Sequence, residues 1–192
     1  MTKILLIDHQ DSFTHNIAQL LEEAGAEVNI LTYQSDLLNK VKDYSYIVLS
    51  PGPGTVNDIP ETIKLIQNCP DNCSILGICL GMQAIAYAYG CRLFRQTKVK
   101  HGQKVSIFKK KNLKPNSVLY NMPNPFEAGL YHSWAVKSDT ISPPLEITAL
   151  SSDGIVMGLK HKSRKIEGVQ FHPESFLCTH GILIIQKWIE SE

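Results

Sequence analysis

The sequence predicts an α/β fold: a mainly parallel sheet with helices on both faces, extended by antiparallel strands in the second half. In the first ninety residues, short aliphatic runs alternate with segments of helical periodicity, a pattern typical of doubly wound sheets. In the second half, short strand-like runs follow one another across turn residues, which favours antiparallel additions. The chain has 192 residues, 43% of them apolar, so we expect one domain over residues 1–192.

Four strands are expected in the first half, because their runs are continuously aliphatic, as in parallel strands covered on both faces. They are residues 3–7, 28–31, 46–49 and 74–78. Helices are expected between them. The first is capped by Asp11 or Ser12 and ended by Gly25, and helix-compatible or helical stretches follow at 35–42, 60–68 and 80–89.

The second half is expected to hold short strands and one closing helix. The predicted strands are residues 105–108, 118–119, 127–131, 146–150, 155–159 and 166–171, and the helix spans 180–189. We find no internal repeat, low-complexity tract or linker that would divide the chain. Ligands of such sheets bind where parallel strands end, which draws attention to the residues after each strand.

Composition narrows the class of protein. The formal net charge is +1, so nucleic acid is not an expected partner. The longest apolar stretches are far too short to cross a bilayer, and no secretory leader is recognisable, so we expect a cytoplasmic protein without membrane contact. Five cysteines are expected to be free thiols in a reducing compartment. Cys69 and Cys73 lack a second nearby pair of ligands, so no metal site is expected.

The strongest chemical signal is Cys79, which stands between Gly77-Ile78 and Leu80-Gly81. A strand ends and a helix begins across this one residue, with glycines two positions before and after it. This is the nucleophile-elbow pattern with cysteine in place of serine. The amides of the following helix favour a thiolate and an oxyanion. The alternative is a small buried cysteine that packs at a strand end.

A cysteine nucleophile needs a base, and the base needs an orienting group. His172 and Glu174 lie two residues apart after a predicted strand, so in extended chain their side chains point the same way. Pro173 restricts His172 to extended geometry. The other six histidines lack this combination and are interpreted as structural or surface residues. They are His9, His15, His101, His132, His161 and His180.

The third element is the loop Ser50-Pro51-Gly52-Pro53-Gly54, which follows the third strand. Its glycines and prolines control backbone geometry, so the loop can aim peptide amides at a developing oxyanion. Pro53 has no amide, so Gly52 or Gly54 would have to donate. By itself, such a loop is also typical of a stiff turn.

Together these motifs resemble the class I (triad) glutamine amidotransferases. Gly-Ile-Cys-Leu-Gly-Met-Gln, Pro-Gly-Pro-Gly and His-Pro-Glu-Ser carry the resemblance over residues 4–181. The opening 8–16, Asp-His-Gln-Asp-Ser-Phe-Thr-His-Asn, is similar to that of the small subunits of anthranilate and aminodeoxychorismate synthases, as are 101–102 and 131–134. Departures are His9 for the usual Asn, Met82 where His is frequent, and Trp134 where an aliphatic residue is commoner. They touch none of the triad and bear only on partner preference.

The resemblance implies a flavodoxin-like fold and a role for each matching residue. Cys79 would form a γ-glutamyl thioester, His172 would act as base and then as acid, and Glu174 would orient it. The amides of Gly52 and Leu80 would form the oxyanion hole, and Pro53 and Gly54 would belong to the same substrate site. The side chain of Gln83 and the backbone of Ser133 and Trp134 would hold the amino-acid end of glutamine.

The resemblance also implies a partner. The chain carries no second synthase domain and no phosphate loop for ATP, so the ammonia would pass to a larger chorismate-using subunit, component I. No cofactor is expected in this chain; magnesium is expected in the partner. The product would be anthranilate, 4-amino-4-deoxychorismate or both. Two alternatives stay open: a γ-glutamyl hydrolase or peptidase on the same fold, and a catalytically silent binding homologue.

Overall fold

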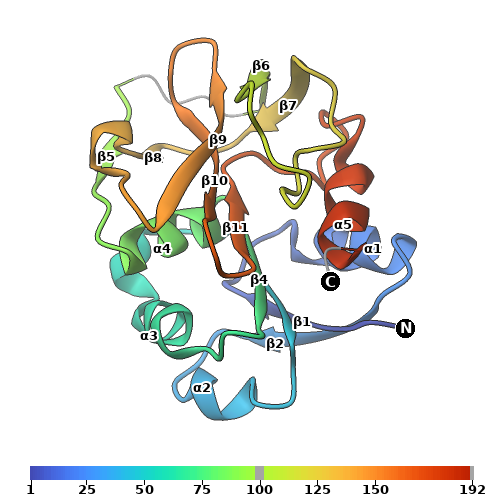
Figure 1. Cartoon of the computed structure of the whole chain (residues 1–192). Helices are drawn as coiled ribbons and strands as arrows, with labels where there is room; N and C mark the ends of the chain where they lie inside the picture. Colours follow the sequence, from blue (N-terminus) through green and yellow to red (C-terminus); the bar gives the residue numbers. More distant parts are fainter. Residues whose placement is uncertain (98–101, 191–192) are drawn as a thin grey trace.

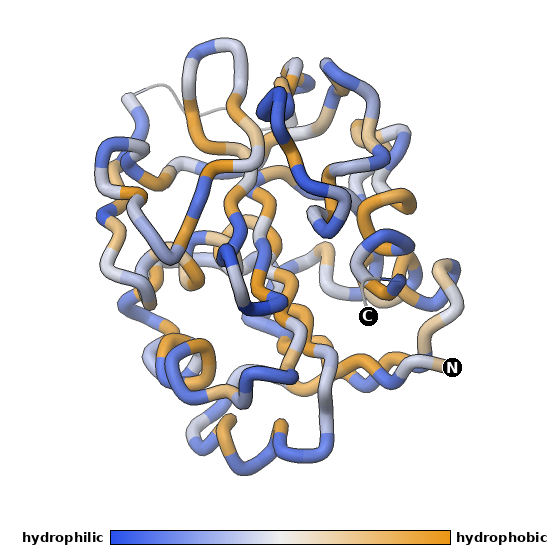
Figure 2. The backbone as a smooth tube through the Cα atoms, viewed as in Figure 1, coloured by the Kyte–Doolittle hydropathy of each residue, from blue (hydrophilic) through white to orange (hydrophobic). Residues whose placement is uncertain are grey.

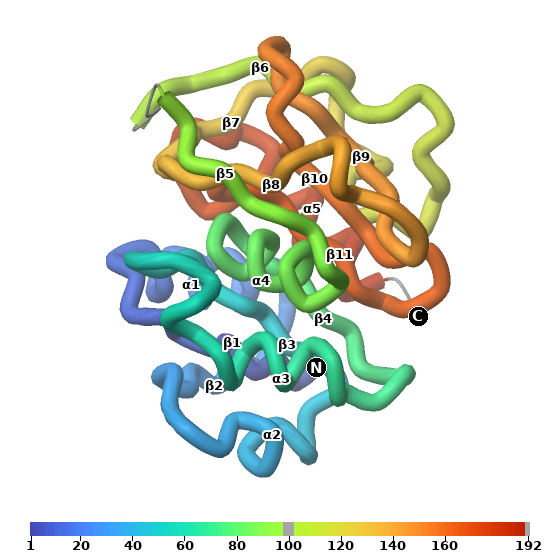
Figure 3. The backbone as a smooth tube through the Cα atoms, turned by 90° about the vertical axis from the view of Figure 1, so that its left-hand side faces the viewer, coloured from blue at the N-terminus to red at the C-terminus, as the bar shows by residue number. Residues whose placement is uncertain are grey.

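A nine-stranded mixed sheet runs through the whole fold, which we describe from a computed structural model over residues 1–97 and 102–190 (Figure 1). The strand order is β2-β1-β3-β4-β11-β10-β9-β6-β7, and β5 and β8 form a separate two-stranded sheet. The predicted fold class is confirmed: parallel strands make one half of the large sheet and antiparallel strands the other, and Figure 3 shows these halves one above the other.

The parallel half comprises five strands. They are β1 (Lys3–Asp8), β2 (Glu27–Thr32), β3 (Tyr46–Leu49), β4 (Ser74–Ile78) and β11 (Ile166–Val169). The first four match the predicted strands closely. β11 comes from the far end of the chain and pairs parallel with β4, so it completes the parallel half.

The antiparallel half extends from the outer edge of β11. It comprises β10 (Val156–His161), β9 (Leu145–Ser151), β6 (Gln103–Lys109) and β7 (Phe126–Leu130). The small sheet pairs β5 (Leu93–Arg95) with β8 (Trp134–Val136), two strands that the sequence analysis did not predict. Two short one-turn helices, η1 (Val56–Asp58) and η2 (Ser138–Thr140), lie in connections.

Helices cover both faces of the parallel half (Figure 1). One core cluster joins the sheet to α1 (Thr14–Glu23) and α5 (Gly181–Glu190), and the other joins it to α2 (Leu37–Lys40), α3 (Pro60–Asn68) and α4 (Leu80–Ala88). Figure 2 shows hydrophobic residues gathered along the central strands, while the peripheral loops are mostly hydrophilic. Within the described ranges, no helix is long and apolar enough to span a membrane.

Two local predictions are wrong. The first helix starts at Thr14 without a side-chain cap: Asp11 instead accepts the Phe13 amide at 2.8 Å, and Asp8 accepts the Thr14 hydroxyl at 2.6 Å. Val118 and Leu119 form no strand. They are buried in a turn, where the Val118 amide donates to Glu167 at 3.0 Å, so burial rather than strand pairing explains their apolar character.

Candidate active site

Cys79 occupies a sharp turn between β4 and α4. Its backbone φ is +53° and ψ is −103°, a conformation that L residues rarely adopt. The turn is so tight that a Cβ on Gly77 would lie 2.5 Å from the carbonyl carbon of Gly81, and one on Gly81 would lie 2.3 Å from the Leu49 carbonyl oxygen. Both glycines are therefore required by packing, which is the physical reason for the spacing seen in the sequence.

His172 reaches Cys79 because β11 runs beside β4. Val169 pairs with Ile78, so the chain leaves both strands at the same edge of the sheet, and the Cys79 amide donates to the Val169 carbonyl at 2.8 Å. His172 Nδ1 lies 2.6 Å from Glu174 Oε1, and these side chains are 2% and 0% exposed. The predicted pairing of imidazole and carboxylate is therefore present in the folded chain.

The surroundings of His172 favour its charged form. Burial lowers its pKa, but Cys79 and Glu174 outweigh burial and raise the pKa of this imidazole to about 10. Nε2, the ring nitrogen not bonded to Glu174, is buried and makes no hydrogen bond to the described residues. Cys79 stabilises the imidazolium electrostatically, although its contact with Nε2 falls short of hydrogen-bond geometry.

Two aromatic rings hold the imidazole, and the sequence analysis assigned neither of them a role. The ring centroid of Tyr131 lies 4.9 Å from that of His172, and the centroid of Phe13 lies 5.5 Å from it. The Tyr131 hydroxyl and the Ser175 hydroxyl are 3.0 Å apart, which ties this ring to the segment that follows Glu174. Phe13 belongs to the opening motif 8–16, and this was the feature of the sequence that could have indicated a role for it.

All seven predicted substrate-binding residues line one pocket of about 290 Å³, and Cys79 lies in its wall. Tyr131 and His132 complete the lining, while His172 and Glu174 lie outside it. The seven are Gly52, Pro53, Gly54, Leu80, Gln83, Ser133 and Trp134. Segments from separate parts of the chain thus meet around the sulfur, which gives a small substrate access to it.

Close packing explains the glycine in the proline-glycine loop. A Cβ on Gly52 would lie 2.7 Å from the Cβ of His9 and 3.0 Å from the side chain of Leu80, so only glycine fits there. Gly54 has a φ of +81°, which favours glycine for conformational reasons. The loop and the first turn of α4 are thus in direct contact, and residues of both line the pocket.

A chain of amide groups links the sulfur to the pocket wall. Gln170 is fully buried, and its Nε2 lies 3.5 Å from Cys79 Sγ. Its Oε1 accepts from Gln83 Nε2 at 3.1 Å, and Gln83 Nε2 also donates to the Trp134 carbonyl at 2.9 Å. The sequence analysis assigned no role to Gln170; its place two residues before His172 was the only signal.

His9 is a structural residue, one of the two alternatives that the sequence left open. Its ring bridges the Ser50 carbonyl oxygen at 3.0 Å and the Thr62 hydroxyl at 2.9 Å, beneath the proline-glycine loop. Burial lowers the pKa of His9 to about 4, although the Ser50 carbonyl and Asp8 oppose the shift. His15 is exposed, and His101 lies outside the described residues. In residues 1–97 and 102–190, no three metal-ligating side chains gather as a metal site.

Similar proteins match this chain over nearly its whole length. The protein-family model described as "Glutamine amidotransferase class-I" matches residues 5–191. An anthranilate synthase component 2 from Pseudomonas putida is 40% identical over 185 residues, covering 93% of this chain and 91% of the relative. One from Cyanophora paradoxa is 37% identical over 189 residues, covering 97% of both chains.

A solved structure shares the fold. It is a protein described as a candidate GMP synthase subunit, from Thermoplasma acidophilum, which superposes with a TM-score of 0.85 over 98% of this chain and 92% of that one. The two sequences are 24% identical, so this likeness bears on the architecture alone.

Proposed function

The chain belongs to the class I glutamine amidotransferase family, and on that premise we propose that it is the glutaminase subunit of a chorismate-aminating synthase. It hydrolyses glutamine to glutamate and passes the ammonia to a larger synthase subunit. One observation carries the proposal: Cys79, beside the buried pair of His172 and Glu174, borders the pocket that all the expected substrate-binding residues line.

In the proposed mechanism, His172 takes the proton of the Cys79 thiol, and the thiolate attacks the side-chain carbonyl carbon of glutamine. The oxyanion accepts hydrogen bonds from the amides of Gly52 and Leu80. As the tetrahedral intermediate collapses, the carbon–nitrogen bond breaks, and the His172 imidazolium gives its proton to the leaving nitrogen, which departs as ammonia. Water then attacks the thioester with neutral His172 as base, and glutamate and the Cys79 thiol are released.

Other residues of the pocket bind and position the substrate. Gln83 and the backbone of Ser133 and Trp134 hold the amino-acid end of glutamine. Gln170 donates toward the sulfur and keeps Gln83 in place through its own carbonyl oxygen. A hydrogen bond to a charged sulfur stabilises the thiolate, so Gln170 is a positioning residue for the nucleophile. No cofactor is required of this chain, and magnesium belongs to the partner.

The larger subunit is proposed to be a chorismate-using component I. The names of the Pseudomonas putida and Cyanophora paradoxa relatives favour anthranilate as the product. The opening segment 8–16 is equally typical of the small subunits that serve 4-amino-4-deoxychorismate synthesis, so this product is the second candidate. A cytoplasmic location agrees with both reactions.

The partner is proposed to dock at the opening segment 8–16, which lies beside the triad through Phe13, and at the loop near His101, which is outside the described residues. Phe176 is 88% exposed only two residues after Glu174, and His15 is exposed at the start of α1. His15→Glu places a negative charge at this surface, where the histidine can carry a positive one. It is expected to weaken the complex in gel filtration. An unchanged elution profile would remove His15 from the interface.

Reconstitution tests the product assignment. The chain is mixed with each component I of its own organism, glutamine, chorismate and magnesium, and the aminated product is identified by mass and fluorescence. The Cys79→Ser variant is expected to lose the glutamine reaction and to keep the reaction with ammonium salt. If no partner yields product and γ-glutamyl peptides are cleaved instead, the chain is a peptidase. If neither substrate reacts, it is a silent homologue.

A further inference from the structure

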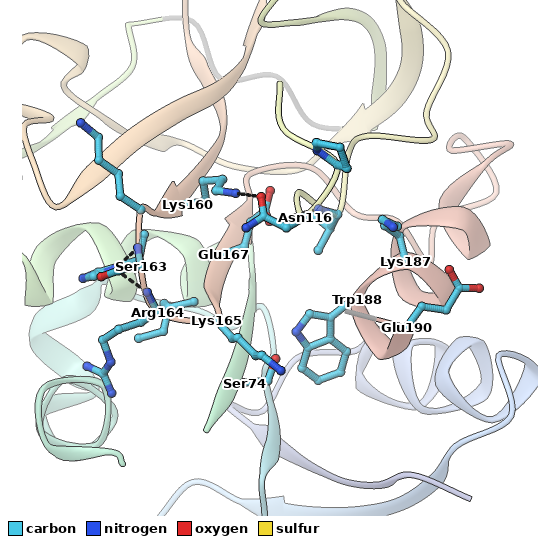
Figure 4. Close-up of a pocket in the computed structure, with 15 residues that line it drawn as sticks. Ser74, Asn116, Lys160, Ser163, Arg164, Lys165, Glu167, Lys187, Trp188 and Glu190 are labelled. Atoms are coloured by element: carbon cyan, nitrogen blue, oxygen red, sulfur yellow. Dashed lines mark hydrogen bonds between the residues drawn. The ribbon is translucent and has the colours of Figure 1, made fainter. Parts of the chain in front are cut away.

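A second cavity, of about 420 Å³, lies at the amino ends of β4 and β11 (Figure 4). The first residues of β4 and β11 form its floor, and Cys79 and His172 follow the other ends of the same two strands. The end of β10, the turn at 115–118 and the last turns of α5 complete it. The proposed glutaminase mechanism uses none of these residues.

The cavity is rich in positive charge. Five cationic side chains line it, against the two carboxylates of Glu167 and Glu190, although the whole chain has a net charge of only +1. The five are Lys160, Lys162, Arg164, Lys165 and Lys187. Arg164 already has partners outside the cavity, because its guanidinium binds Asp71 at 3.3 Å and the Cys69 carbonyl at 2.6 Å.

Lys160 is an unusual member of this group because its side chain is almost wholly buried. It is 4% exposed, and its ammonium donates to Asn116 Oδ1 at 2.6 Å. Within the described ranges, no carboxylate lies within ion-pair distance of it. Glu167, a buried carboxylate of the same cavity, makes no ion pair with Lys160 but interacts with it electrostatically, so the charge of this ammonium is offset without a direct carboxylate partner.

The lining of the cavity includes a buried hydrogen-bond donor. Trp188 is 3% exposed, and its indole Nε1 is buried without a partner in the part of the chain that the structure describes. Figure 4 shows this nitrogen on the edge of the ring that faces Ser74 and Lys165. Two carboxylates also line the cavity. The Glu167 oxygens already accept from the Ser117 hydroxyl at 2.5 Å and the Val118 amide at 3.0 Å, and the Glu190 carboxylate belongs to the last turn of α5.

We propose that this cavity binds a small anion through phosphate or carboxylate oxygens. The ligand accepts from Trp188 Nε1 and from the ammonium groups of Lys160 and Lys165, which offer donors and positive charge but few acceptors. The volume lies within the range of small-molecule sites, and the indole ring and Ile166 add apolar surface. This site is separate from glutamine chemistry, so it stands or falls independently of the proposed function.

Calorimetric titration of the full chain tests the site. Inorganic phosphate and citrate are the two probes, and sodium chloride at equal ionic strength is the reference. Saturable heat with phosphate alone assigns a phosphate ligand, and saturable heat with citrate alone assigns a carboxylate ligand. Saturation by neither probe, at concentrations on the order of 10 mM, would overturn the proposal.

Variants locate the binding. Lys165→Ala and Trp188→Phe each remove one donor and are expected to raise Kd about tenfold, while the phenyl ring preserves packing against Tyr46. Lys111→Ala removes the same charge from an exposed loop away from the cavity and is expected to leave Kd within about twofold. Equal Kd values in all variants would show that the ions bind elsewhere and would overturn the site. An unfolding midpoint close to that of the wild type in each variant verifies that it is folded.

Discussion

Replacing Glu174 with glutamine tests how the imidazole of His172 is kept in its charged form. In the wild type, Glu174 Oε1 lies 2.6 Å from His172 Nδ1, and both side chains are essentially inaccessible to water. Glutamine has almost the same shape and can still present an oxygen to the Nδ1 proton. The substitution therefore removes the negative charge and keeps the hydrogen bond.

The magnitude follows from the geometry. A hydrogen bond between charged groups contributes about 1.5–3 kcal/mol and a neutral one about 0.5–1.5 kcal/mol, so the loss is about 1–1.5 kcal/mol. That corresponds to about one pKa unit. The carboxylate favours the imidazolium, so its loss lowers the pKa of His172 from about 10 by about one unit. The same loss in the transition state lowers kcat/KM about tenfold.

The assay is glutamate release as a function of pH. Because His172 must carry a proton to release ammonia, kcat/KM falls on the alkaline side as the imidazolium titrates. This alkaline limb is expected to lie about one pH unit lower in Glu174→Gln than in the wild type. Glu22→Gln, an exposed change on α1 with the same charge difference, is the control. An alkaline limb that does not move relative to this control would refute the role given to Glu174.

Three further substitutions test other parts of the site and its support. Gln170→Met removes the donor 3.5 Å from Cys79 Sγ, so we expect both kcat/KM and the alkylation rate of Cys79 by iodoacetamide to fall about tenfold; unchanged alkylation would contradict the contact. Gly81→Ala places a Cβ 2.3 Å from the Leu49 carbonyl oxygen and is expected to cost about 1–3 kcal/mol in calorimetric unfolding; an unchanged midpoint would mean that α4 shifts freely. Burial holds the pKa of His9 near 4, below the 6.5 of the unfolded chain, so stability is lost as pH falls from 6.5 toward 4, by about 3 kcal/mol. In urea unfolding, His9→Asn should escape this loss, and equal acid sensitivity would show that His9 is not its source.

The first half of the fold was predictable because its signals are local. Each aliphatic run of β1, β3 and β4 is bounded by a turn residue, and the predicted boundaries of these strands agree with the observed ones to within one residue. The cysteine elbow was predictable for the same reason. Its two glycines are required by contacts that lie within the elbow and the first turns of α4 or at the end of the neighbouring strand.

Features that depend on distant contacts could not be predicted. Gln170 acts through an amide chain that joins α4, β8 and the end of β11, and nothing in its neighbours along the sequence indicates this. β5 and β8 have three residues each, too short for a periodicity, and they pair across a long intervening segment. Val118 and Leu119 look like a strand because burial and strand pairing leave the same apolar pattern.

The position of His172 depends on a topological choice that the sequence does not state. After α4 the chain leaves the parallel half and forms the antiparallel strands β6, β7, β9 and β10. It then returns as β11, which pairs with β4 between the two halves. Had this last strand joined the outer edge instead, the same His-Pro-Glu motif would lie several strands, each about 5 Å wide, from Cys79. Parallel pairing of Val169 with Ile78 brings the two chain segments out together. The pairing of β11 with β4 therefore decides whether the cysteine has a base. This makes β11 as necessary to the proposed chemistry as the residues that perform it.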